Sequence, residues 1–122
     1  MENEGFKGLQ VYKKAYALCI QIHEMSRGFP REERYELASQ IRRASTSVPL
    51  NIAEGQERRE SKGDYRRFIQ IARGSCAEMR VLLDMAKDFG YIDEAVREKY
   101  YAGYEEINRM LIGLQRYVEN RK

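Results

Sequence analysis

The chain has 122 residues and a formal net charge of +3, which fits one domain with a single hydrophobic core over residues 1–122. Its 43% apolar and 34% charged residues are typical of a soluble helical protein. No apolar run approaches the ~20 residues that span a bilayer, and the acidic N-terminus lacks the pattern of a secretory signal. We therefore expect a cytoplasmic protein with no membrane partner.

The first half of the chain predicts two helices, because apolar residues recur three or four positions apart. The first helix is expected over residues 9–25 and is ended by the Gly28-Phe29-Pro30 segment. The second helix is expected over residues 31–59, with Pro30 opening it at a position that needs no N–H.

Pro49 lies in the middle of the second helical pattern, where a proline costs about 3 kcal/mol. Its ring crowds the carbonyl of Ser45, and it has no N–H to donate to that carbonyl. We expect one long helix with a fixed bend, in which the hydroxyls of residues 45–47 bond to freed carbonyls. We also expect a structural polar cluster that fixes the bend, formed by Asn51, Glu54 and Glu78.

The second half of the chain predicts two further helices. Ser61 and, three residues on, Asp64 form a capping pattern at the start of the third helix, which Gly90 ends. Asp93 is expected to cap the fourth helix, whose apolar stripe continues to Val118. Four helices joined by short turns favour an all-α, antiparallel up-down-up-down four-helix bundle with a proline kink in its second helix.

Gly74 lies inside the third helix, where glycine costs about 1 kcal/mol relative to alanine. A neighbouring helix that approaches closely would explain it, and we expect that neighbour to be the segment around Pro49. The other helical glycines are isolated, so the sequence contains no glycine-rich phosphate loop.

The titratable residues do not point to catalysis, and we expect that the protein is not an enzyme. Cys19 and Cys76 lack a Cys-x-x-Cys spacing and are expected to be free, buried thiols. His23 is the one histidine, and no glutamate stands three residues before it, which excludes a carboxylate-bridged di-metal site. We expect no metal and no cofactor. Glu54 and Glu78 could serve as an acid and a base, but buried carboxylates are generally paired, which favours a structural role.

Basic residues concentrate in the middle of the sequence. Residues 42–80 include nine basic and five acidic residues, a local net charge of +4. In the third helix, basic residues recur every seven positions and so share one narrow sector: Arg66, Arg73, Arg80 and Lys87. Such a row could follow a phosphate backbone. The alternative is a solvated face with local ion pairs such as Glu54–Arg58 and Arg80–Asp84.

Three parts of the sequence carry a family resemblance: residues 40–55, residues 71–78 and residues 89–92. They resemble the small four-helix-bundle proteins encoded in intervening sequences of bacterial 23S ribosomal RNA genes. Residues 6–15 are similar to the opening segment of that family, although Gly8 and Tyr12 replace its usual aspartate and tryptophan. The family looks like a set of ring-forming homopentamers, and a related group is the accessory protein of diversity-generating reverse transcriptases.

The resemblance implies that this chain forms a homo-oligomer, with a pentamer expected, whose repeated basic surface engages RNA or DNA and a protein such as a reverse transcriptase. By the same resemblance, the nucleic-acid contacts fall on Arg58, Arg59, Lys62, Arg66, Arg67 and Arg73. We therefore expect a non-enzymatic oligomeric bundle that binds nucleic acid, with Tyr101 at a subunit interface. The alternative is a protein-interaction scaffold or accessory subunit without direct nucleic-acid binding.

Overall fold

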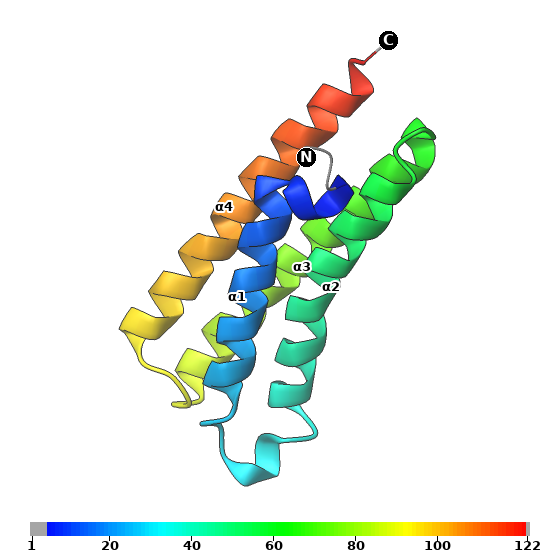
Figure 1. Ribbon diagram of the computed structural model, residues 1–122. Coiled ribbons are helices and arrows are strands. Elements are labelled where there is room, and N and C mark those ends of the chain that lie inside the picture. Colours follow the sequence, from blue (N-terminus) through cyan, green and yellow to red (C-terminus); the bar gives the residue numbers. More distant parts are fainter. Residues whose placement is uncertain (1–4, 122) are drawn as a thin grey trace.

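The computed structural model describes residues 5–121, and Figure 1 shows a molecule built from helices. Two short 3₁₀ helices, η1 and η2, each precede one of the first two of four α-helices. The bounds of the elements are η1 Gly5–Gly8, α1 Gln10–Ser26, η2 Arg31–Glu33, α2 Leu37–Glu57, α3 Lys62–Asp88 and α4 Glu94–Glu119. No strand occurs among the described residues, and the predicted all-α four-helix fold is confirmed.

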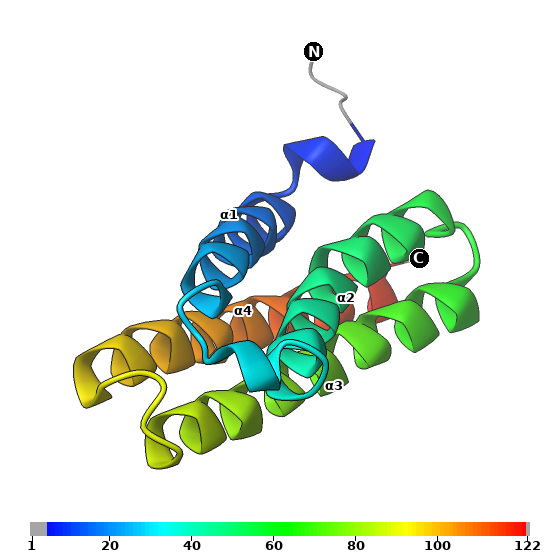
Figure 2. The same ribbon diagram turned by 90° about the horizontal axis from the view of Figure 1, so that it is seen from below.

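Consecutive helices lie side by side in the bundle. Followed by colour in Figure 1, α1 runs down the view, α2 up, α3 down and α4 up. Figure 2 shows α1 above α4 and α2 above α3, and contacts join α1 to α2 and α4, and α3 to α2 and α4. The α2–α3 turn and the end of α4 therefore lie at one end of the bundle, and the α1–α2 connection lies at the other.

Apolar side chains from all four helices meet in one core. Its largest fully buried members follow the predicted inner stripes and include Ile22, Ile41, Ile52, Tyr65, Ile69, Met79, Leu83, Tyr104, Ile107 and Leu111. Phe89 and Tyr117 continue the apolar patterns of α3 and α4 but are 56% and 71% exposed, because they lie near the ends of their helices, where fewer helices surround them. Both cysteines are free thiols, with Cys76 buried and Cys19 half-buried. None of the described helices has both the length and the apolar character needed to cross a membrane.

The second α-helix begins at Leu37, later than the predicted residue 31. The chain instead forms η2 and a turn over residues 31–36, and Glu33 explains the late start. Its Oε1 accepts a hydrogen bond from the Leu37 N–H at 3.3 Å, and its Oε2 accepts one from Tyr91 Oη at 2.8 Å. One carboxylate thus satisfies the first amide of α2 and joins this connection to the α3–α4 turn.

The predicted boundaries of α3 and α4 are confirmed by their caps. The hydroxyl of Ser61 accepts a hydrogen bond at 3.2 Å from the N–H three residues on, and Oδ1 of Asp93 does the same at 2.8 Å. Gly90 adopts a φ of +85°, which a side chain would strain. This backbone turn lets the Tyr91 N–H reach the carbonyl of Ala86 at 2.8 Å and ends α3.

Helix α2 continues through Pro49, which is buried. The neighbouring hydroxyls bond to a different carbonyl from the one that the sequence predicts. Ser45 Oγ and Thr46 Oγ1 both donate to the carbonyl of Arg42, at 3.0 and 2.7 Å. A hydroxyl in a helix reaches back three or four residues, so these two cannot serve the carbonyl of Ser45 that Pro49 leaves without a donor. A bend at Pro49 stays a prediction.

Candidate nucleic-acid interface

The six predicted nucleic-acid contacts lie on the α2–α3 turn, which is at the upper end of the bundle in Figure 1, and in the first half of α3. Arg58 Nε donates to Glu54 Oε2 at 2.7 Å, which confirms the local ion pair expected from their spacing. Arg59 Nη1 donates to a backbone carbonyl of the preceding turn at 2.9 Å. Arg67 Nη2 lies 3.7 Å from Asp64 Oδ1. These three guanidinium groups are exposed.

The end of α4 contacts the same region. Arg66 Nε donates to Glu119 Oε2 at 2.7 Å, and Arg121 Nη2 donates to the carbonyl of Arg59 at 2.7 Å. Lys62 Nζ donates to the carbonyl of Arg121. The hydrogen bond from Arg66 holds the pKa of Glu119 below its ordinary value, so this carboxylate is ionised at neutral pH. Lys62 and Arg66 therefore hold the end of α4 as well as carrying charge at the surface.

The basic row of α3 lies along the seam between α3 and α4. Besides Arg66, two of its members reach α4 side chains. Arg73 Nε donates to Asn108 Oδ1 at 3.2 Å, and Lys87 Nζ lies 3.8 Å from Glu94 Oε1. The sequence pattern places these residues on one sector of α3. Because α4 packs beside that sector, the basic side chains there contact residues of α4.

Arg80, the remaining member of the row, does not form the predicted pair with Asp84. Asp84 instead pairs with Arg97 of α4 at 3.0 Å, because the neighbouring helix brings a guanidinium close to it. Arg80 Nε donates to the carbonyl of Cys76 in its own helix at 3.4 Å. Its guanidinium therefore has no carboxylate partner among residues 5–121.

Between Arg73 and Arg80, the two helices leave a hollow of about 320 Å³, here called the α3–α4 groove. Its lining residues are Gln70, Arg73, Gly74, Ala77, Arg80 and Asn108. Two guanidinium groups and two amides thus surround small residues, and no acidic residue lines the groove. Sequence reasoning missed Asn108 as a site residue because it belongs to another helix, and no local pattern connects it to the basic row.

Gly74 lies at the surface, and a Cβ added there would have no atom within 4 Å. The prediction that the segment around Pro49 packs closely against Gly74 is therefore wrong. Helices α2 and α3 come close at Gly55 instead, where a Cβ would lie 3.3 Å from the Cβ of Phe68. Packing within the chain gives no reason for a glycine at position 74.

The polar cluster expected at the proline takes a different form. Asn51 Nδ2 donates to the carbonyl and the hydroxyl of Ser47 at 2.8 and 3.0 Å, and Ser75 Oγ donates to Ser47 Oγ at 2.8 Å. Glu78 lines the same hollow of about 570 Å³ as Asn51, but Glu54 belongs to the ion pair at the α2–α3 turn. No hydrogen bond among residues 5–121 joins Asn51, Glu54 and Glu78 to one another. Asn51 bonds to Ser47 instead, and the α3 residue that bonds to Ser47 is Ser75.

These features define an all-helical four-helix bundle with a basic seam between its last two helices. The chain belongs to the 23S rRNA-intervening sequence protein family, which it matches over residues 7–113. It is also similar to the crystal structure of a protein of unknown function from the S23 ribosomal protein family of Bacteroides thetaiotaomicron, with 25% sequence identity and a TM-score of 0.79. That similarity covers 87% of this chain and 95% of the other. A comparison with curated proteins found no match.

Proposed function

We propose that this protein is a non-enzymatic bundle that binds RNA or DNA by holding the phosphate backbone in the α3–α4 groove. The observation that carries the proposal is the pair Arg73 and Arg80 on either side of a surface that includes Gly74, with no acidic lining residue. Glycine leaves room for a backbone phosphate where any other residue would place a side chain. The names of the matched family and of the similar structure both refer to ribosomal constituents, so RNA is the first ligand to test.

The surface next to the groove would add to this binding. Arg66 and Arg67 precede it on α3, and their ion-paired side chains are 49% and 58% exposed. Exposed ion pairs contribute about 0–1 kcal/mol, so a phosphate can compete for their guanidinium groups. Contacts of this kind carry no base preference and make the affinity strongly dependent on salt concentration.

Fluorescence anisotropy of a labelled single-stranded RNA, and of the same strand as DNA, tests the proposal from low to high salt. In an Arg73→Gln/Arg80→Gln variant, the slope of log affinity against log salt should become shallower by about 1.4, because each phosphate contact on a single strand contributes about 0.7. An unchanged slope would refute the groove as the phosphate-binding surface.

A second variant tests whether binding depends on the shape of the groove as well as on its charge. Gly74→Gln fills the groove without changing the net charge and should weaken binding of the strand. Gly113→Gln is the matched control, because Gly113 is also an exposed helical glycine with no atom within 4 Å of an added Cβ. Equal affinities of these two variants for the strand would argue against close approach at position 74.

A second candidate function is docking to a further copy of the chain or to another protein, and an apolar row on the outer face of α3 favours it. Ile71, Val81 and Met85 are 43%, 54% and 42% exposed and lie on the same side of the helix. Exposed apolar side chains that gather on one face of a helix are typical of an interaction site. The row would serve a homopentamer or a partner such as a reverse transcriptase. Tyr101 is half-buried against the core, and its place at a subunit interface stays a prediction.

Sedimentation velocity at micromolar concentration tests the second candidate. The wild-type chain should sediment as an oligomer, and a Val81→Glu/Met85→Glu variant as a monomer. Tyr35→Glu is the control, because Tyr35 is 83% exposed on the η2–α2 connection, away from the row. A monomeric wild-type protein would remove self-association and leave the nucleic-acid proposal standing.

A further inference from the structure

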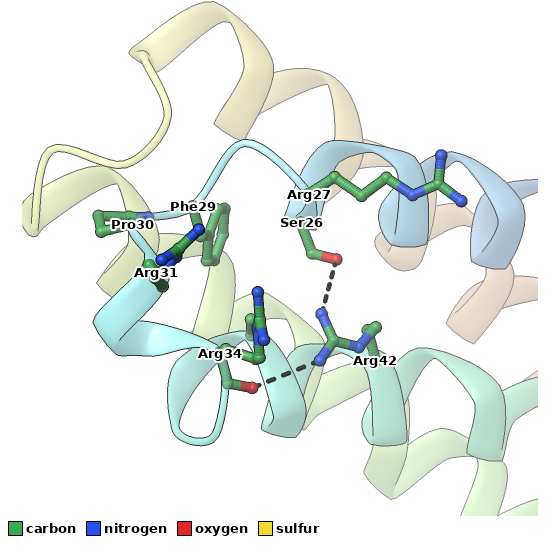
Figure 3. A pocket seen from close by; sticks show the side chains of 8 residues that line it. Ser26, Arg27, Phe29, Pro30, Arg31, Arg34 and Arg42 are labelled. Carbon is green, nitrogen blue, oxygen red and sulfur yellow. Dashed lines mark hydrogen bonds between the residues drawn. The ribbon is translucent and has the colours of Figure 1, made fainter.

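A second basic feature lies at the other end of the bundle, where α1 leads into α2 (Figure 3). A hollow of about 280 Å³ is bounded there by the end of α1, the η2 connection and the first turns of α2. Four of its lining residues are arginines, and none is acidic. We call this hollow the arginine pocket, and its polar and aromatic lining consists of Arg27, Arg31, Arg34, Arg42, Ser26 and Phe29.

Arg42 is held in the pocket by two hydrogen bonds, both drawn in Figure 3. Its Nη1 donates to Ser26 Oγ at 3.2 Å, and its Nη2 donates to the carbonyl of Arg34 at 3.4 Å. Ser26 Oγ itself donates to the carbonyl of His23 at 2.9 Å, so its oxygen is oriented to accept from Arg42. A guanidinium has five N–H donors, and those that these bonds leave free can bind a ligand.

No carboxylate lines the pocket, and of its four arginines only Arg27 forms an ion pair among the described residues, with Glu24 at 3.5 Å. Among residues 5–121, no ion pair involves Arg31, Arg34 or Arg42. Glu33, in the same connection, is already hydrogen-bonded at 2.8 Å to a tyrosine hydroxyl of the α3–α4 turn. Figure 3 shows the guanidinium groups of Arg31, Arg34 and Arg42 around the hollow. The side chain of Arg27 points away from it, along α1. Like charges gathered in this way repel one another, and a bound anion would relieve the repulsion.

We propose that the arginine pocket binds a phosphate monoester end-on, with Arg31, Arg34 and Arg42 around its oxygens. Near neutral pH a monoester carries about −1.5 to −2 charges and three acceptor oxygens, which suits several converging guanidinium groups better than the single charge of a diester. Planar guanidinium groups also bind phosphate oxygens in pairs. Phe29, at 8% exposure, forms an apolar side of the pocket beside these charges.

A phosphate monoester occurs on a free nucleotide and at the 5′ end of a nucleic-acid strand. Binding of a free nucleotide is independent of the α3–α4 groove, which lies along other helices. Binding of a strand end rests on the function proposed above. The shared chemistry is the dianionic terminal phosphate, and two experiments distinguish the sources.

In the first experiment, isothermal titration calorimetry in a phosphate-free buffer measures binding of inorganic phosphate and of adenosine 5′-monophosphate. The Arg31→Gln/Arg34→Gln variant removes two exposed guanidinium groups and should bind the nucleotide at least about tenfold more weakly, as expected for lost charge-assisted hydrogen bonds. The matched control, Arg109→Gln/Arg116→Gln, removes the same charge from exposed positions of α4 and should bind like the wild type. Equal affinity of both variants would overturn the pocket as the site.

In the second experiment, anisotropy compares the same RNA with a 5′-phosphate and with a 5′-hydroxyl. A preference for the phosphorylated strand that disappears in Arg31→Gln/Arg34→Gln would support the pocket and assign the strand end as its ligand. Nucleotide binding without such a preference would support the pocket and assign the free nucleotide. If the protein does not bind the nucleotide and the 5′-phosphate does not increase the affinity for RNA, the pocket proposal is overturned. Salt-dependent binding of the 5′-hydroxyl strand would still support the α3–α4 groove.

Discussion

Replacing Gly74 by alanine should stabilise the protein, although the position lies in the middle of its longest helix. Glycine inside a helix costs about 1 kcal/mol relative to alanine, because its backbone loses more conformational freedom on folding. The new methyl group would meet no atom within 4 Å, so no steric cost opposes this gain. We expect the free energy of unfolding to rise by about 1 kcal/mol and the melting temperature by about 4 °C.

Two further glycine-to-alanine variants serve as comparisons for the expected gain in the free energy of unfolding. Gly113→Ala should stabilise by a similar amount, because that glycine is also helical, exposed and free of neighbours. Gly55→Ala should give no gain, because its methyl group would lie 3.3 Å from the Cβ of Phe68, which moves only with the backbone of α3. Urea denaturation followed by circular dichroism at 222 nm measures all three variants against the wild type.

One outcome would refute the reasoning about Gly74. If Gly74→Ala lowers the free energy of unfolding while Gly113→Ala raises it, something packs against Gly74 that a single chain does not contain. The measurement is therefore repeated over a range of protein concentrations. A destabilisation that grows with concentration would identify a second copy of the chain as the neighbour.

The contacts and burial of individual side chains lead to four further predictions. Glu119→Gln removes the carboxylate that holds Arg66, so single-stranded RNA should bind more tightly and with a steeper salt dependence in the anisotropy assay. Burial raises the pKa of the Cys76 thiol from 9.0 to about 12, so iodoacetamide at pH 8 should modify Cys19 first, as peptide mass spectrometry can show. Since the unfolded thiol loses its proton first, the same shift should lower the free energy of unfolding as the pH rises from about 9 to 12. Asn51→Ala removes two hydrogen bonds and should lower the free energy of unfolding by about 1 kcal/mol in a urea titration, and an unchanged value would mean that those bonds are not stabilising.

The helices and most of their ends could be predicted because the signals for them are local. A hydroxyl or carboxylate at a helix start, as at Ser61 and Asp93, acts on an amide only three residues away. Gly90 ends α3 through its own backbone conformation. The start of α2 could not be predicted in this way, because Glu33 caps it from η2 while also bonding to Tyr91, which is distant in the sequence.

The candidate site, like the helix ends, was predicted only where its residues follow a local sequence pattern. The seven-residue spacing of basic side chains placed Arg73 and Arg80 on one sector of α3, and the structure keeps them there. Only the packing of α4 decided that Arg66 pairs with Glu119, that Asn108 completes the groove and that Asp84 is engaged by another helix.

The sequence by itself therefore determined the class of fold, the helix faces that are buried and the concentration of positive charge. The tertiary structure alone decided which charges are paired and which remain available, as at Arg42, whose partners come from the end of α1 and the η2 connection. The physical reason is the distance along the chain over which each interaction acts. Helical periodicity and capping depend on residues within one or two turns, whereas ion pairing and pocket shape depend on how separate helices pack, which local patterns do not specify.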